Sequence, residues 1–84
     1  MLKVYGAKWC PHCTQTVEYL KKNRIKFDYI EIEEQPEHVI QKIVEVNGGD
    51  DWVVPTLEFN GKWRKGKVFN EIELHFELGQ LGVK

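Results

Sequence analysis

The sequence predicts an α/β fold in which about four strands form a mixed sheet flanked by three helices, in the order β-α-β-α-β-β-α. Two observations predict this class. Segments with the two-residue alternation of strands are interspersed with segments of helical periodicity, and an Asn60-Gly61 dipeptide separates the last two strands. The chain has 84 residues, which is room for one domain with a thin core. We therefore expect a single domain over residues 1–84.

The first half of the chain predicts a right-handed βαβ unit with two parallel strands. Met1 to Tyr5 alternates polar and apolar residues and reads as a strand. Pro11 suits the first position of a helix, and that helix should end near Asn23. Residues 26–32 follow as a second strand whose alternation changes phase between Tyr29 and Ile30. The apolar side of the helix is expected to carry Cys13, Val17 and Leu20.

The second half predicts another helix, a hairpin and a closing helix. Pro36 opens the helix, and Asn47-Gly48-Gly49 stops it. Val53 to Phe59 is predicted as a strand interrupted by Pro55, and the chain returns through residues 62–64. The apolar stripe of the second helix comprises Ile40, Ile43 and Val44.

The closing helix is expected to begin at Asn70 or a neighbour, after a break at Lys65-Gly66. We expect Ile72, Phe76 and the nearby leucines to face inward. Gly79 and Gly82 are predicted to end this helix.

Composition excludes several classes of function. Lysine plus arginine number 12 and aspartate plus glutamate 13, so the net charge of -1 argues against nucleic-acid binding. No apolar run approaches the roughly 20 residues that cross a bilayer, so we expect no membrane association. The start of the chain lacks the long apolar segment of a signal peptide, which predicts a cytoplasmic protein. We further expect a monomer.

Both cysteines lie in Cys10-Pro11-His12-Cys13, and three interpretations compete. A structural disulfide across so short a loop would remove little chain entropy. A zinc site would need two further ligands, and no closely spaced histidine pair exists among His12, His38 and His75. A redox dithiol needs only two sulfurs that can close a ring and one thiolate that can attack. We favour the dithiol and expect no metal.

The CxxC at a strand-to-helix junction, the element order and Val54-Pro55-Thr56 before a hairpin together resemble a glutaredoxin of the thioredoxin-fold superfamily. The resemblance covers essentially the whole chain. It implies a thioredoxin-like fold and a thiol–disulfide oxidoreductase of the dithiol CPHC type. It also implies that the Val54-Pro55 peptide bond is cis.

The two cysteines are predicted to play different roles. Cys10 should lie at the helix N-terminus, where unpaired backbone amides stabilise a thiolate, and so should be the nucleophile. Cys13 should lie one turn further in on the apolar side, more buried, and should resolve the mixed disulfide. The resemblance implies the same roles.

Three neighbours are candidates for tuning the Cys10 pKa: Lys8, Pro11 and His12. Lys8 would stabilise the thiolate by Coulomb attraction and His12 as an imidazolium. The competing interpretation of Lys8 and His12 is that both are ordinary surface residues. The resemblance implies that Lys8 also meets a carboxylate of bound glutathione, and that tyrosine is common where His12 stands.

The remaining candidates bind the substrate. The backbone of Val54, next to Pro55, is expected to pair with an extended substrate. The competing interpretation is that Pro55 only marks the entry to a strand and has no binding role. Trp9 is a weaker candidate, which would shield the sulfur. Of the glycine pair and aspartate that hold glutathione in the family, only Gly66 is present. The acidic pair Asp50-Asp51 should repel glutathione carboxylates, with Lys65 and Lys67 as candidates to compensate.

We therefore expect an oxidoreductase with no permanently bound cofactor, acting on a disulfide-containing protein substrate. Its electron donor would be glutathione, another low-molecular-weight thiol, or a reductase. Two alternatives are an iron–sulfur cluster bridged between two subunits and a non-catalytic interaction module. The resemblance implies that clusters favour motifs without a proline after the first cysteine, so Pro11 argues against the cluster. The acidic residues Glu31, Glu33 and Glu34 are interpreted as a solvated edge, and His38 and His75 as surface or boundary residues.

Overall fold

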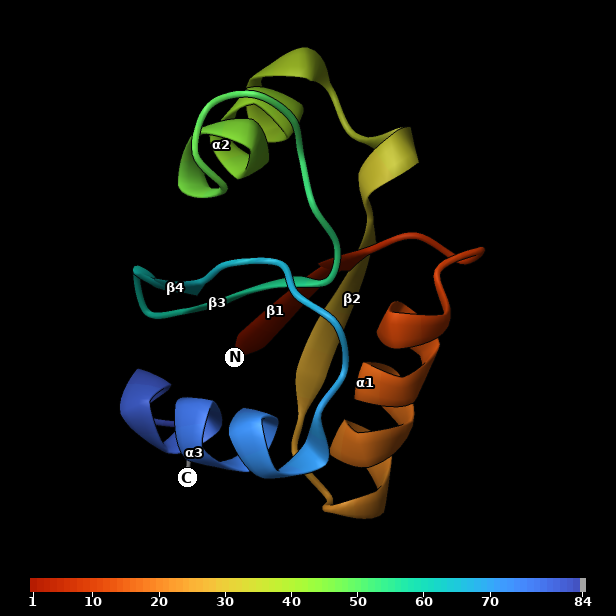
Figure 1. The fold of residues 1–84 in the computed structure, drawn as a ribbon, viewed down its shortest axis with the longest axis vertical. Helices are drawn as coiled ribbons and strands as arrows, with labels where there is room; N and C mark the ends of the chain where they lie inside the picture. Colours follow the sequence, from red (N-terminus) through yellow and green to blue (C-terminus); the bar gives the residue numbers. More distant parts are fainter. Residues whose placement is uncertain (84) are drawn as a thin grey trace.

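The computed structural model describes residues 1–83 and contains one four-stranded sheet with three α-helices (Figure 1). This arrangement confirms the predicted fold class and the β-α-β-α-β-β-α order. A single 3-10 turn, η1, is inserted after the second strand. The elements are β1 (Leu2–Gly6), α1 (Pro11–Lys22), β2 (Phe27–Glu31), η1 (Ile32–Glu34), α2 (Glu37–Val46), β3 (Thr56–Phe59), β4 (Lys62–Arg64) and α3 (Glu71–Leu81).

The strands lie in the order β2-β1-β3-β4. β1 and β2 are parallel, and their register sets Gly6 opposite Glu31 at the end where the chain enters the CxxC loop. β3 runs antiparallel to both β1 and β4. The turn between β3 and β4 has positive φ at Asn60 (51°) and Gly61 (84°), the backbone that an Asn-Gly hairpin favours.

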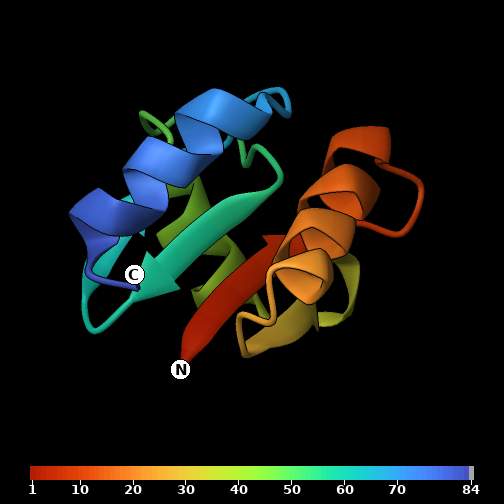
Figure 2. The ribbon, with the colours of Figure 1, turned by 90° about the horizontal axis from the view of Figure 1, so that it is seen from below.

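The helices cover both faces of the sheet. Figures 1 and 2 show α1 and α3 together on one face and α2 on the other. The buried apolar side chains form two clusters. One cluster comprises Leu2, Val4, Tyr19, Leu20, Leu57, Leu74, Leu78 and Leu81. The other comprises Tyr5, Ala7, Cys10, Cys13, Ile32 and Ile43.

The inward face of α3 differs from the prediction. Ile72 and Phe76 are 72% and 67% exposed, whereas Leu74, Leu78 and Leu81 are buried. At 100° per residue these leucines share one face, and Ile72 and Phe76 lie on the opposite one. The helix is apolar on both sides, and a thin domain can bury only one of them.

Two element boundaries also differ from the prediction. β3 begins at Thr56, not Val53, because Pro55 has no N–H for the ladder with β1. α3 continues through Gly79 and ends at Leu81, followed by Gly82, whose φ of 92° suits the left-handed C-cap. The predicted N-cap is confirmed, since the side chain of Asn70 accepts the amide of Glu73 at 2.9 Å. None of the helices described is long and apolar enough for a bilayer span.

Candidate active site

Cys10 lies at the end of the loop that connects β1 to α1. It is the N-cap of α1, and Pro11 occupies the first helical position, where its missing N–H costs no hydrogen bond. The amide of Cys13 donates to Cys10 Sγ at 3.3 Å. On its other side, the Cys10 thiol faces the carbonyl oxygen of Val54 at 3.9 Å. The sulfur therefore sits at the positive end of a helix, in the position that stabilises a thiolate.

Cys13 occupies a more buried position one turn into α1. Its exposed fraction is 1%, against 5% for Cys10, and both are free thiols. Burial is the main reason that the pKa of Cys13 is raised from 9.0 to about 12, and interactions with Cys10 and Glu31 raise it further. At neutral pH Cys13 is therefore a thiol. Within residues 1–83 no group of three or more histidine, cysteine or carboxylate side chains is placed to hold a metal ion.

The loop before Cys10 carries Lys8 and Trp9, both exposed. The Trp9 indole donates to Glu33 Oε1 at 2.8 Å, and its ring lies 6.4 Å from the ring of Trp52. The backbone amide of Lys8 donates to Glu31 Oε1 at 3.0 Å. Two tryptophans thus flank the surface next to the nucleophile, although the sequence singled out only Trp9.

His12 is directed toward the segment that leads into α3. Its Nδ1 accepts the amide of Phe69 at 3.1 Å. This bond occupies the Nδ1 nitrogen of His12 and holds the ring against the Phe69 backbone. Its visible role is to tie the first turn of α1 to the residue before the Asn70 cap.

The Val54-Pro55 segment borders Cys10 through the Val54 carbonyl. The peptide bond is cis, which confirms what the resemblance implies. Val54 precedes the β1–β3 ladder, which begins at Thr56, so its backbone lies outside the sheet pairing.

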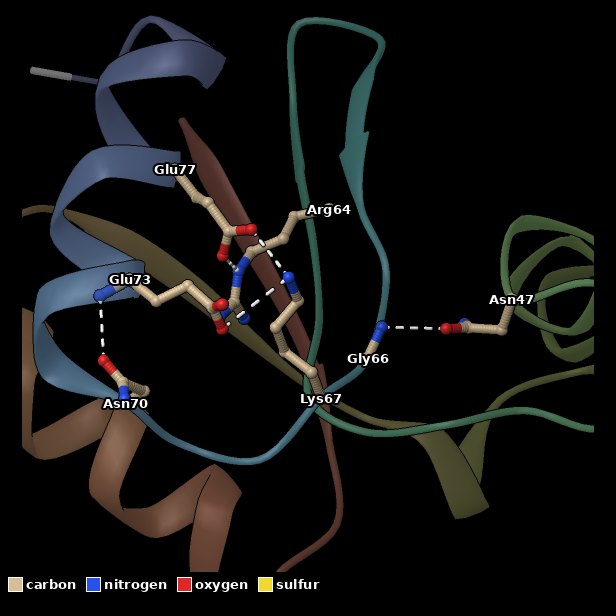
Figure 3. A network of polar contacts seen from close by, with 7 residues as sticks. All are labelled: Asn47, Arg64, Gly66, Lys67, Asn70, Glu73 and Glu77. Carbon is tan, nitrogen blue, oxygen red and sulfur yellow. Dashed lines mark hydrogen bonds and ion pairs between the residues drawn. The ribbon is translucent and has the colours of Figure 1, made fainter.

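Gly66 packs directly against this segment. A Cβ on Gly66 would lie 2.6 Å from Val53 Cγ1 and 2.7 Å from the Val53 carbonyl carbon, so only glycine permits the approach. Asn47 links Gly66 to Thr56. Its Oδ1 accepts the Gly66 amide at 2.8 Å (Figure 3). Its Nδ2 donates to Thr56 Oγ1 at 3.0 Å. The structure therefore brings Gly66 to the Val54-Pro55 segment, while Lys65 stays exposed.

Lys67 joins a polar network with Arg64, Glu73 and Glu77 (Figure 3). Its Nζ lies 2.6 Å from Glu77 Oε2 and 3.7 Å from Glu73 Oε1. The other oxygen of Glu77 accepts from Arg64 Nε at 2.6 Å, and the Arg64 side chain is only 5% exposed. Burial alone would raise the pKa of Glu77, but the hydrogen bonds from Lys67 and Arg64 outweigh it and lower that pKa. Lys67 is therefore engaged by two carboxylates of α3.

Glu31 corrects the prediction of a solvated acidic edge. Glu33 and Glu34 are exposed as expected, but Glu31 is 9% exposed, and its Oε1 accepts from the Lys8 amide and from the Tyr29 hydroxyl, both at 3.0 Å. The signal in the sequence was the change in polar–apolar alternation after Tyr29, because it accompanies the burial of Glu31 at the end of β2. His38 and His75 are exposed, as predicted.

Known proteins share this architecture. The family model for glutaredoxin matches residues 2–63. The glutaredoxin from Archaeoglobus fulgidus superposes with a TM-score of 0.71 and 30% identity, covering 89% of this chain and 82% of that one. Wheat glutaredoxin shares the fold, with a TM-score of 0.68 and 24% identity over 98% of this chain and 75% of that one. A comparison with curated protein sequences gives no match. With its Cys10–Cys13 pair, the chain belongs to the glutaredoxin family, which comprises thiol–disulfide oxidoreductases.

Proposed function

We propose that this protein reduces protein or low-molecular-weight mixed disulfides, with Cys10 as the nucleophile and Cys13 as the resolving thiol. The observation that supports this division is the unlike setting of the two sulfurs. Cys10 caps α1 and accepts a backbone amide, whereas Cys13 is buried and its pKa is raised to about 12. One sulfur is set up to carry negative charge, and the other to hold a proton.

In the first step the Cys10 thiolate attacks one sulfur of the substrate disulfide. That sulfur bonds to Cys10, and the other sulfur leaves as a thiolate. In the second step Cys13 loses its proton and attacks Cys10 Sγ, which releases the remaining substrate sulfur. The substrate disulfide is reduced by two electrons, and the Cys10–Cys13 pair is oxidised to a disulfide. A thiol or a reductase then regenerates the dithiol.

The substrate surface would consist of Trp9 and Lys8 on one side of Cys10 and the Val54-Pro55 segment with Lys65 and Gly66 on the other. The Val54 backbone is available to pair with an extended substrate, because the β1–β3 ladder starts only at Thr56. The glutaredoxin family is typically glutathione-dependent, so glutathione is the first electron donor to examine.

The activity itself can be tested by turnover. The protein is given a small mixed disulfide, with glutathione and glutathione reductase in one series and dithiothreitol in the other. We expect consumption of reducing equivalents above the uncatalysed rate in at least one series. If both series match the uncatalysed rate while thiol titration finds two free cysteines, the protein is not an oxidoreductase of this type.

We expect glutathione to be used weakly because of Asp50 and Asp51. Both are exposed in the segment that leads to Val54, and Lys67 is held by Glu77 and Glu73. Replacing both by asparagine should raise kcat/KM for a glutathione mixed disulfide by about three- to tenfold, since an exposed charge interaction is worth up to ~1 kcal/mol. The gain should shrink at high salt.

Asp28→Asn is the control for this pair, because Asp28 is exposed on the edge strand β2, one residue from the strand end remote from Cys10. An equal gain from Asp28→Asn would assign the effect to net charge. No gain from the Asp50 and Asp51 substitutions would refute local repulsion as the cause of weak use.

A further inference from the structure

Among the residues that the structure describes, one buried side-chain oxygen has no hydrogen-bond partner, and it is Glu31 Oε2. The other carboxylate oxygen accepts two bonds, from the Lys8 amide and the Tyr29 hydroxyl. An unsatisfied buried acceptor costs roughly 1–3 kcal/mol, and folded proteins contain few of them. This one belongs to a residue that lines the same groove as Cys13, and it calls for a functional explanation.

Gly6 is the point where the end of β2 and the Cys13 sulfur come together. Gly6 is the register partner of Glu31 across the β1–β2 pair. A Cβ on Gly6 would lie 3.2 Å from Cys13 Sγ and 2.9 Å from Tyr29 Cε1. The Cys13 sulfur and the Tyr29 ring therefore both pack against Gly6. The Tyr29 hydroxyl donates a hydrogen bond to Glu31 Oε1 at 3.0 Å.

A groove between α1 and β2 joins these groups. Its volume is about 990 Å³, and both Cys13 and Glu31 line it, together with Tyr29. The charged side chains that border it are Lys8 from the CxxC loop, Glu18 and Lys21 from α1, and Glu34 from η1. The groove is open, so a proton held by Glu31 has a route to solvent.

Ring closure needs a base at this place. Cys13 is a thiol at neutral pH, and a thiol must lose its proton to attack. A thiol with a pKa of about 12 is ionised in only about one molecule in 10⁵ at pH 7. The Glu31 charge itself disfavours the Cys13 thiolate, so it helps closure only by accepting the proton.

We propose that Glu31 accepts the Cys13 proton during ring closure. The inference rests on the proposed division of roles between the cysteines. As Cys13 Sγ bonds to Cys10 Sγ, the Cys13 proton passes to Glu31 Oε2, directly or through one water in the groove. The bond between Cys10 and the substrate sulfur breaks, and that sulfur leaves with the electron pair. The proton then leaves Glu31 through the groove to solvent.

The two steps can be separated with one equivalent of a dinitrobenzoate disulfide, the thiol-assay reagent that releases yellow thionitrobenzoate. Attack by Cys10 releases the first coloured thiolate, and closure by Cys13 releases the second. Stopped-flow absorbance therefore gives both rates in one trace. The informative substitution is Glu31→Gln, which keeps an oxygen for the Lys8 and Tyr29 bonds and removes the basic group.

In Glu31→Gln we expect the first phase to be unchanged and the second to slow by about 10²-fold, the size of a lost general base. Closure in this variant should also rise in proportion to hydroxide concentration. A purely electrostatic role predicts the opposite sign, because removing the charge favours the Cys13 thiolate and speeds closure. A second phase that is faster or unchanged overturns the proposal.

Glu34→Gln is the matched control, because Glu34 borders the same groove but is exposed. It should leave both phases unchanged, and equal slowing by the two substitutions would refute a specific role for Glu31. The first phase reports that the site is folded in every variant. If the unmodified protein shows no second phase, the resolving role of Cys13 fails, which is distinguishable from failure of the Glu31 proposal.

Discussion

We expect Cys10→Ser to abolish disulfide exchange, whereas Cys13→Ser should still attack once and then stall as a mixed disulfide. The expectation follows from the sulfur positions, because Cys10 alone caps α1 and accepts an amide there. A serine hydroxyl in its place is not ionised at neutral pH and does not attack disulfides. In Cys13→Ser the first step is intact, but no second sulfur is available to close the ring.

Mass spectrometry after reaction with oxidised glutathione checks this pair of variants. Cys13→Ser should gain one glutathione moiety, mapped to Cys10, and Cys10→Ser should gain none. Alkylation of the unmodified protein at neutral pH should label Cys10 first, since the pKa of Cys13 is about 12. Faster labelling of Cys13 would reverse the two roles.

Glu77→Ala should lower the free energy of unfolding by about 2–4 kcal/mol. The substitution leaves the Arg64 guanidinium, 5% exposed, without its partner, and an unpaired buried charge is among the costliest defects in a fold. The value is set below that of a fully buried pair because Glu77 is 22% exposed. Urea denaturation measures the loss, and Glu77→Gln should lose less because it keeps an acceptor for Arg64.

The Glu77 contribution should also depend on acid. Because folding lowers the pKa of Glu77 below 4.5, the stabilisation is fully present above about pH 4.5 and is lost as pH falls through the folded-state pKa. Glu77→Gln should remove this part of the acid sensitivity. Glu45→Ala is the control, since Glu45 forms an exposed pair with Lys42 and should cost less than about 0.5 kcal/mol. Equal losses for Glu45 and Glu77 would contradict the buried-charge explanation.

The elements and their order were predictable because their signals are local. Pro11 fixes the start of α1 and so places Cys10 at its cap, and Asn60-Gly61 supplies the positive φ values that the hairpin needs. The inward face of α3 was not predictable, since it depends on which apolar stripe the sheet accepts. The burial of Glu31 was missed because the sequence marked only a change of phase.

The polar contacts of the site were also beyond the sequence. His12 binds the amide of Phe69, 57 residues away, and Lys67 binds Glu77 of α3. Such pairings depend on where the chain brings remote segments together. The sequence therefore predicted which residues surround Cys10 better than it predicted what their side chains contact.

Asn47 has a consequence for how fast a substrate is captured. Its amide group joins the C-terminus of α2, the first residue of β3 and the Gly66 loop, through Ile43, Thr56 and Gly66. The start of β3, which follows Val54-Pro55, and the loop at Gly66 are thus ordered during folding, before any substrate arrives. Little conformational entropy is left to lose on association, so encounter rather than loop closure should limit capture.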